Sequence, residues 1–346
     1  MQLFSNDLGL DLGTSNVLMN VDGQGVVVRE PSVVAIDRNT GKLLQVGAAA
    51  RNMLGRTPGN VVAMHPLKDG VISDHELTVK MLQEFFQKTS KSKIFTPKPR
   101  VVMCVPSGVT EVEERTIINA AIEAGARRVY LIEAPLAAGL GAGLDVSGPG
   151  GHLVVDIGGG TTDIGVLSMN GVANSSSIKV AGNAFDEAIA RYIRRSHNVI
   201  IGQATAEDVK IQIGRMSKDA ENTTMTVSGR DARTGAPREV MIQAYEVCDA
   251  LARPAQRIAD EILSVLEGTS PELVGDIAKN HITLTGGGAQ IWGMDRFLAE
   301  ATGIPCSLAD DPASCAVYGC GKSLAWITTM NEGPINIARR RIMNQR

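Results

Sequence analysis

The stretch VVDIGGGTTDIGVL, residues 154–167, places three glycines and two threonines between Asp156 and Asp163. Apolar residues flank this turn on both sides, which predicts a β-hairpin. LGLDLGTSNVLM, residues 8–19, repeats the pattern: an acid at a strand end, a Gly/Thr turn and a second apolar strand. The repeat predicts two similar α/β halves, whose hairpins would face each other across one cleft.

The residue types in both hairpins suit phosphate chemistry. Glycines let the backbone approach a ligand closely, and successive N–H groups in a tight turn form an anion site. Threonine hydroxyls add donors, while a nearby aspartate can hold Mg²⁺ or its waters. Asp11 and Asp156 would flank such a metal. A single Gly-rich turn is often only a connection between strands, but two matching turns indicate a clamp on a Mg-nucleoside triphosphate.

A third glycine cluster, ITLTGGGAQIWGMDRFLAE at 282–300, reads as a strand, a Gly-rich turn and a helix. It lacks the GxGxxG spacing of a dinucleotide-binding fold and the GK[ST] of a P-loop. A flat glycine turn here would let a purine ring lie against the backbone.

Composition limits the function further. The chain has 346 residues, of which 44% are hydrophobic, so it can form two domains or one body split into lobes. A net charge of -3 and only 3% aromatic residues argue against nucleic acid as a partner. The five cysteines form no CxxC pair and are expected to be reduced thiols. With no signal peptide and no spanning segment, we expect a cytoplasmic protein with at most peripheral membrane contact.

Periodicity predicts mixed strands and helices. Strands are predicted at 8–12, 17–21, 25–29, 32–36, 101–105, 153–157, 163–168 and 282–285. One helix is expected to follow an N-cap at Ser73, and another to run from a cap at Thr110 to Gly125. Further helices are predicted at 184–196, 205–216, 245–268 and 290–302, and an exposed hairpin at 228–239.

DLGTSN, DIGGGTTD and LTGGGA resemble the phosphate-1, phosphate-2 and adenosine motifs of the actin/Hsp70/hexokinase ATPase superfamily. Within it, the chain is similar nearly end to end to the MreB/Mbl family of bacterial actin homologues. The similarity is carried by REPSVVAI (29–36), NMLGRTPGNVVAMHPLKDGVISD (52–74), VPSGVTEVEER (105–115) and TAEDVKIQIG (205–214). It implies an actin-like α/β fold with two ribonuclease-H-like lobes and smaller insertions around a nucleotide cleft.

The resemblance also implies domain boundaries. Subdomain IA would comprise 1–32, 67–150 and a return at 317–346 that ends in a basic tail. Subdomain IB would be 33–66, subdomain IIA would comprise 151–181 and 247–316, and subdomain IIB would be 182–246.

By the same resemblance, ATP and Mg²⁺ are the expected cofactors. The first phosphate loop would comprise Gly13, Thr14, Ser15 and Asn16. The second would comprise Gly158, Gly159, Gly160 and Thr161, with Gly182 close to the phosphates. Asp11 and Asp156 would serve the metal, Asp156 by orienting metal-bound water.

The nucleoside would be held by two further segments. Glu207 and Lys210 would contact the ribose and the adenine edge, although this pair alone could be an ordinary surface pair one helical turn apart. The adenosine would be backed by Gly286, Gly287, Gly288 and Ala289.

The chain departs from the family pattern before Pro135. Relatives usually carry there a glutamate that positions the attacking water, whereas this chain has Ala134, with Glu133 one position earlier. Adjacent residues at a helix entry point about 100° apart. We therefore expect intact ATP binding with slow or altered hydrolysis, in which Glu133, Thr161 and Asp156 are the candidate catalytic residues.

The implied function is a cytoskeletal protein whose membrane-associated filaments determine cell shape and guide cell-wall synthesis. The expected partners are copies of itself, the inner face of the cytoplasmic membrane and integral membrane proteins of the cell-elongation machinery. Ile94 and Phe95, flanked by lysines, would insert into the membrane surface, unless they instead begin a core strand.

Two other functions of the same superfamily are alternatives. An Hsp70-like ATPase switch would need a substrate-binding region after the ATPase body. A small-molecule kinase would need a catalytic base, for which Asp163 and Asp186 are the candidates near the cleft motifs.

Overall fold

Two five-stranded sheets of the same design form the body of the molecule, for which the computed structural model describes residues 7–89, 98–219 and 221–329. The first sheet runs in the order β10 (Arg128–Glu133), β9 (Arg100–Val105), β1 (Leu8–Leu12), β2 (Asn16–Val21) and β3 (Gly25–Pro31). The second runs in the order β13 (Gly171–Ile178), β12 (Thr162–Ser168), β11 (His152–Ile157), β17 (Ile282–Thr285) and β18 (Cys306–Leu308).

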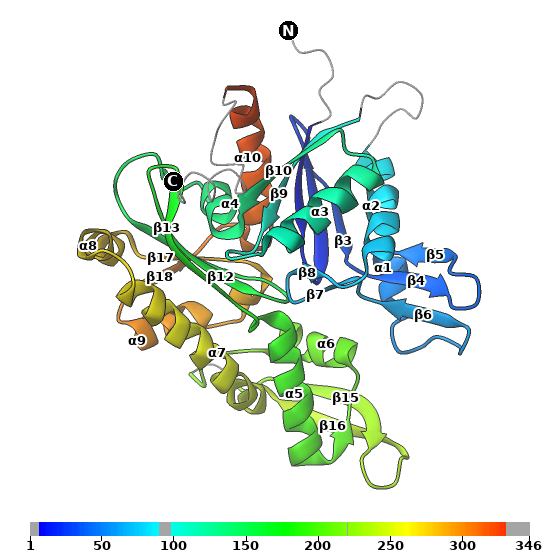
Figure 1. The fold of residues 1–346 in the computed structure, drawn as a ribbon. Coiled ribbons are helices and arrows are strands. Elements are labelled where there is room, and N and C mark those ends of the chain that lie inside the picture. The colour runs from blue at the N-terminus through cyan, green and yellow to red at the C-terminus, as the bar shows by residue number, and fades with distance from the viewer. Residues whose placement is uncertain (1–6, 90–97, 220, 330–346) are drawn as a thin grey trace.

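Each sheet joins an antiparallel hairpin to parallel strands. β1 pairs antiparallel with β2 and parallel with β9, and β11 pairs antiparallel with β12 and parallel with β17. The repeat seen in the two hairpin sequences therefore extends to the topology of two whole lobes (Figure 1).

Smaller sheets branch from each lobe. One contains β5 (Leu43–Val46), β4 (Val34–Asp37) and β6 (Val61–Met64), and the other contains β14 (Val199–Ile200), β15 (Thr224–Asp231) and β16 (Pro237–Gln243). They lie inside the segments expected to be subdomains IB and IIB, whose boundaries remain predictions. The predicted hairpin at 228–239 is confirmed by β15 and β16. A short ribbon of β7 (Leu67–Lys68) and β8 (Val71–Ile72) completes the strands of the described residues.

The helices cover the sheets and connect the lobes (Figure 1). Those of the first lobe and its small sheet are α1 (Ala48–Arg51), α2 (His75–Thr89), α3 (Glu111–Ala124), α4 (Ala134–Gly141) and α10 (Cys315–Thr329). The others are α5 (Gly182–His197), α6 (Gln203–Ile213), α7 (Ala244–Glu267), α8 (Pro271–Asn280), α9 (Met294–Thr302) and the 3₁₀ turns η1 (Gly287–Gln290) and η2 (Pro312–Ser314). Of the helices that the structure describes, none has the length and apolar character required to cross a bilayer.

Local capping signals set the starts of α2 and α3. Thr110 forms the predicted capping box with Glu113, and α3 ends at Gly125, as expected. The cap predicted at Ser73 was wrong: Asp74 accepts the Leu77 N–H at 3.0 Å, while the Ser73 hydroxyl donates to the Pro66 carbonyl. The aspartate caps because its carboxylate reaches the free N–H groups of the first turn.

The helix predicted at 290–302 is divided. A 3₁₀ turn ends at Gln290, and α9 begins only at Met294, because Gly293 lies between them with φ +78°. The positive φ turns the chain, which is the conformation that glycine adopts at little cost.

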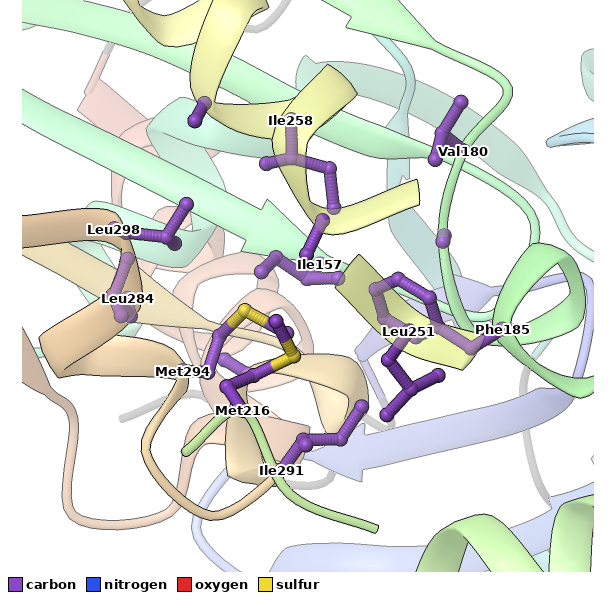
Figure 2. Packing of buried hydrophobic residues seen from close by; sticks show 14 of the residues in the cluster. Ile157, Val180, Phe185, Met216, Leu251, Ile258, Leu284, Ile291, Met294 and Leu298 are labelled. Carbon is purple, nitrogen blue, oxygen red and sulfur yellow. The ribbon is translucent and has the colours of Figure 1, made fainter. Parts of the chain in front are cut away.

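Separate hydrophobic clusters fill the two lobes. The cluster of the second lobe packs β11 and β17 against α5, α7 and α9, with Phe185 and Leu251 among its fully buried side chains. Figure 2 shows Met216, just beyond α6, next to Met294 of α9 and below Ile157. The strand that carries the second Gly-rich turn is thus anchored from several sides.

A third cluster joins the lobes through α4 and α10. A methyl group on Gly319 would lie 1.8 Å from the Ala137 carbonyl oxygen, and one on Gly141 equally close to the Cys315 carbonyl oxygen. The two helices therefore touch backbone to backbone. This contact determines how far apart the two hairpin turns lie.

Candidate functional site

A cavity of about 770 Å³ lies between the lobes, where both hairpin turns and the third glycine turn converge. This volume is in the range that suits a small-molecule ligand. The predicted site residues that line it are Asp11, Gly13, Thr14, Ser15, Asn16, Asp156, Gly158, Gly159, Gly160, Thr161, Gly182, Glu207, Lys210, Gly286, Gly287 and Gly288. Glu133 and Ala289 are not among the lining residues.

The two phosphate loops abut directly. A methyl group on Gly159 would lie 2.0 Å from the Ser15 hydroxyl, and one on Gly160 would lie 2.4 Å from the Thr14 hydroxyl. The Thr14 hydroxyl also accepts the Gly70 N–H at 2.9 Å. Only glycine leaves room for opposing loops this close, which explains why so few side chains separate Asp156 from Asp163.

Three carboxylates gather behind these loops. Asp11 lies one residue before the end of β1, and strand register places Asp156 opposite Asp163 in the second hairpin. Enclosure by protein raises the pKa of Asp11 to about 6, with Asp163 adding repulsion and the Cys104 thiol partly offsetting it. Burial also raises the pKa values of Asp156, well above its usual range, and of Asp163. A bound cation would relieve the cost of ionising this cluster.

The residues fit a magnesium ion that arrives with phosphate. Among the described residues, no three His, Cys, Asp or Glu side chains are close enough to form a metal site by themselves. Mg²⁺ is commonly held by one or two carboxylates together with waters and substrate phosphates. Asp11 and Asp156 are suited to that limited role.

Asp163 has a structural role in the hairpin. Its carboxylate accepts the Ser107 N–H at 3.0 Å and the Thr161 hydroxyl at 2.9 Å. It therefore fixes Thr161, the last residue of the second phosphate loop, against the first lobe. Sequence reasoning weighed Asp163 only as a kinase base, although its place opposite Asp156 in a hairpin could have shown that it lies in the cleft.

Glu207 and Lys210 line the cavity but do not pair with each other. The Glu207 carboxylate forms an ion pair with the Arg51 guanidinium of the first lobe, with Nη2 and Oε2 2.6 Å apart. Lys210 pairs with Asp186 at 2.8 Å and donates to the Gly182 carbonyl at 3.1 Å. The alternative of an ordinary surface pair does not describe them, because both side chains are tied to other elements of the cleft.

The three glycines after β17 differ in their surroundings. Gly286 has φ +83°, and a methyl group there would lie 2.3 Å from the Ile157 carbonyl oxygen. Gly288 is restricted by the Ile157 side chain at 2.5 Å, whereas nothing lies within 4 Å of a methyl on Gly287. Gly286 and Gly288 let the turn pack on β11, and Gly287 faces open space. Ala289 is buried in the core of the second lobe.

The start of α4 places Ala134 rather than Glu133 at the cavity. Ala134 lines it, whereas the Glu133 carboxylate accepts the Ser107 hydroxyl at 3.4 Å. The position at which the family resemblance implies a water-orienting glutamate is therefore occupied by a methyl group. Whether Glu133 takes part in hydrolysis stays a prediction.

Sequence reasoning missed the residues at the far end of the cavity. Arg215, Thr223 and Trp292 line it together with the third glycine turn. The Trp292 ring lies 5.6 Å from the Arg215 guanidinium and 6.0 Å from that of Arg296. No local motif signals these residues, since their convergence depends on the bridge between Arg215 and Trp292.

The fold and cleft define the class: two lobes of one topology with two phosphate-type loops in contact between them, as in actin-like nucleotide-binding proteins. Comparison with known proteins gives the family. A family model described as "MreB/Mbl protein" matches residues 5–332. The chain belongs to the MreB/Mbl family.

Curated relatives and solved structures agree with this family assignment. The chain is 48% identical over 319 residues to the cell shape-determining protein Mbl of Bacillus cereus, covering 92% of this chain and 96% of that protein. It is 48% identical over 329 residues to the cell shape-determining protein MreB of Escherichia coli K12, covering 94% and 95%. The crystal structure of MreB5 of Spiroplasma citri bound to ADP has a TM-score of 0.89 at 41% identity, covering 94% and 98%. The predicted actin-like fold is confirmed.

Proposed function

We propose that this chain is an ATP-binding, actin-like cytoskeletal protein that polymerises into membrane-associated filaments, which determine cell shape and guide cell-wall synthesis. The observation that carries the proposal is the contact of two phosphate-type loops across a cavity between matched lobes. Family membership supports it, since the similar curated proteins are cell shape-determining proteins. A structure of MreB5 with AMPPNP, 41% identical to this chain, supports nucleotide binding.

The cavity residues fit Mg-ATP by their chemistry. Backbone N–H groups of the glycine turns and the hydroxyls of Thr14, Ser15 and Thr161 are donors suited to phosphate oxygens. Asp11 and Asp156 would hold the metal or its waters. Gly287 leaves open space for the nucleoside, beside which Glu207 would take a ribose hydroxyl. Bound Mg²⁺ supplies charge neutralisation at the phosphates.

Hydrolysis is proposed to be slow. Orienting a water in line with the terminal phosphate requires a positioned acceptor, and Ala134 offers none. Thr161 is held by Asp163 and could supply a hydroxyl near that water. The protein would then remain longer in its ATP state than relatives with a glutamate at this position.

Sedimentation tests the filament proposal. High-speed pelleting of the purified protein with Mg-ATP, Mg-ADP or no nucleotide should depend on nucleotide and show a critical concentration. A MamK double-helical filament, 23% identical with a TM-score of 0.78, shares the fold. Protein that stays in the supernatant at all concentrations, also with anionic vesicles, would overturn the proposal. The Hsp70-like switch and the kinase would then be reconsidered; no observation favours either.

Membrane attachment is a separate part of the proposal. Ile94 and Phe95 lie outside the described residues, and their support is the sequence: two bulky apolar residues between Lys91, Lys93 and Lys98. The double variant I94S/F95S should lose co-sedimentation with anionic vesicles and keep nucleotide-dependent pelleting. Unchanged vesicle binding would exclude this anchor. The proposed partners at the membrane are integral proteins of the cell-elongation machinery, and pull-down with the same variant tests that contact.

A further inference from the structure

Arg51 and Glu207 form an ion pair across the mouth of the cavity. Arg51 is the last residue of α1 beside the first small sheet, and Glu207 lies on α6 of the opposite lobe. Their closest atoms, Arg51 Nη2 and Glu207 Oε2, are 2.6 Å apart, although 156 residues separate them in the chain. Glu207 lines the cavity and Arg51 does not, so the guanidinium approaches from the outer side of the rim.

The pair leaves one carboxylate oxygen of Glu207 for a ligand. Arg51 engages Oε2, and within the ranges 7–89, 98–219 and 221–329 no hydrogen bond to Oε1 occurs. An arginine on one oxygen keeps a carboxylate ionised and restricts its rotation. Glu207 is thereby held with its second oxygen available to a ribose hydroxyl.

His65 places this pair beside the first phosphate loop. Its ring lies against the backbone of Ser32 and Thr14. It is close enough to the ion pair for the Glu207 charge to raise its pKa and the Arg51 charge to lower it. Its Nδ1 atom is buried without a hydrogen-bond partner in the described structure. Burial lowers the pKa of His65, so the ring is neutral at pH 7.5 and does not compete with Arg51 for Glu207.

We propose that Arg51 is a positioning residue for nucleotide retention. By holding Glu207 across the cavity mouth, it orients the carboxylate for the ribose and keeps the two small subdomains closed over bound nucleotide. This inference rests on the proposed function. Because both side chains are about one-third exposed, at 38% and 30%, solvent screens the pair and its effect is limited. We expect loss of Arg51 to speed nucleotide release about two- to fivefold, and fivefold is the upper limit for an exposed ion pair.

The test measures release and association separately. A fluorescent N-methylanthraniloyl ATP analogue with Mg²⁺ is bound below the critical concentration for pelleting and chased with unlabelled ATP in a stopped-flow instrument. Arg51→Ala should raise the release rate about two- to fivefold and leave the association rate nearly unchanged. Arg51→Lys keeps the charge but loses the planar guanidinium, so its release rate should lie between those of the parent and Arg51→Ala.

A double-mutant cycle shows whether Arg51 acts through Glu207. In a Glu207→Gln background, Arg51→Ala should change the release rate little, because the carboxylate charge with which Arg51 pairs is already absent. Arg115→Ala is the matched control: it removes a surface arginine paired with Glu111 on α3, away from the cavity lining, and should leave release unchanged.

The outcomes separate this inference from the proposed function. An unchanged release rate in Arg51→Ala, or a full effect in the Glu207→Gln background, would overturn the positioning role while nucleotide binding stands. A parent protein that binds no labelled ATP would refute the proposed function, and this inference with it. Thermal denaturation without nucleotide checks that the variants fold.

Discussion

At the scale of single residues, Ala134 decides the expected rate of hydrolysis. Ala134 lines the cavity at the position where the family resemblance leads us to expect a carboxylate. We predict that Ala134→Glu raises phosphate release by at least about tenfold, because a positioned acceptor of this kind typically contributes more than that. Phosphate release at saturating Mg-ATP is the measurement.

Ala134→Leu is the matched control for that substitution. Leucine has a branched side chain of comparable volume but offers no hydrogen-bond acceptor, so it should restore none of the rate. Equal rates in the parent and Ala134→Glu, with nucleotide affinity intact, would show that the missing carboxylate does not limit turnover.

A second residue-scale prediction concerns Asp156, whose pKa is raised mainly by burial. The folded protein holds this proton more tightly than the unfolded chain, so the cost of ionisation grows as pH rises from about 4 through the folded pKa. Asp156→Asn should therefore raise the melting temperature of nucleotide-free protein at pH 7.5 by roughly 1–2 °C, which corresponds to about 1 kcal/mol in a chain of 346 residues. Thermal denaturation between pH 4 and 7.5 measures it.

The advantage of Asp156→Asn should shrink towards pH 4, where the folded carboxyl is protonated and the unfolded one is about half protonated, and it should vanish below that pH. The Asp156→Asn variant should also lose the stabilisation by Mg-ATP, since the amide does not replace the metal-binding carboxylate. A variant that is less stable than the parent at pH 7.5 would contradict the role of burial.

At the scale of elements, the contact between α4 and α10 governs the distance between the lobes. A methyl on Gly319 would lie 1.8 Å from the Ala137 carbonyl oxygen, so Gly319→Ala must separate the helices. We expect a loss of about 2–3 kcal/mol, as for overpacking of a tight core. Nucleotide affinity should fall as well, because both loops are carried on strands that pack against these helices. Urea unfolding and nucleotide titration measure the two effects.

Gly275→Ala in α8 supplies the contrast. A methyl there meets nothing within 4 Å, so the same substitution should gain up to about 1 kcal/mol of helix propensity. Similar stabilities for the two variants would mean that α4 and α10 can move apart without cost.

At the scale of the whole molecule, the cavity is built from both lobes, so nucleotide binding should stabilise them together. Mg-ATP at about 100 times its dissociation constant should add about 2.7 kcal/mol to the stability of the chain by mass action. One cooperative transition that shifts upward is expected in calorimetry.

Magnesium tripolyphosphate is the control for that shift. It can engage the two phosphate loops and leaves the nucleoside end of the cavity empty, so its effect should be smaller. Two transitions of which only one responds to Mg-ATP would mean that a single lobe holds the nucleotide.

Much of the fold could be predicted because its signals are local. Thr110 and Glu113 form their capping box within one helical turn, and each glycine turn can be recognised from a few consecutive residues. Strands β10 and β13 were not predicted. β13 carries a serine run with few strong strand formers, and its pairing with β12 is what makes it a strand. The cap at Asp74 was missed because neighbouring Ser73 has the same local preference.

Local signals were enough to predict the two hairpins, the three glycine turns and the acids beside them, because turn geometry and phosphate chemistry depend on residues close together in the chain. Only the tertiary structure decided that Gly159 meets Ser15 and that Ala134, not Glu133, faces the cavity. The reach of Arg51 to Glu207 was equally invisible, since it crosses 156 residues and depends on how the lobes pack. Such encounters are set by the summed contacts of α4, α10 and the sheets, which no short stretch of sequence contains.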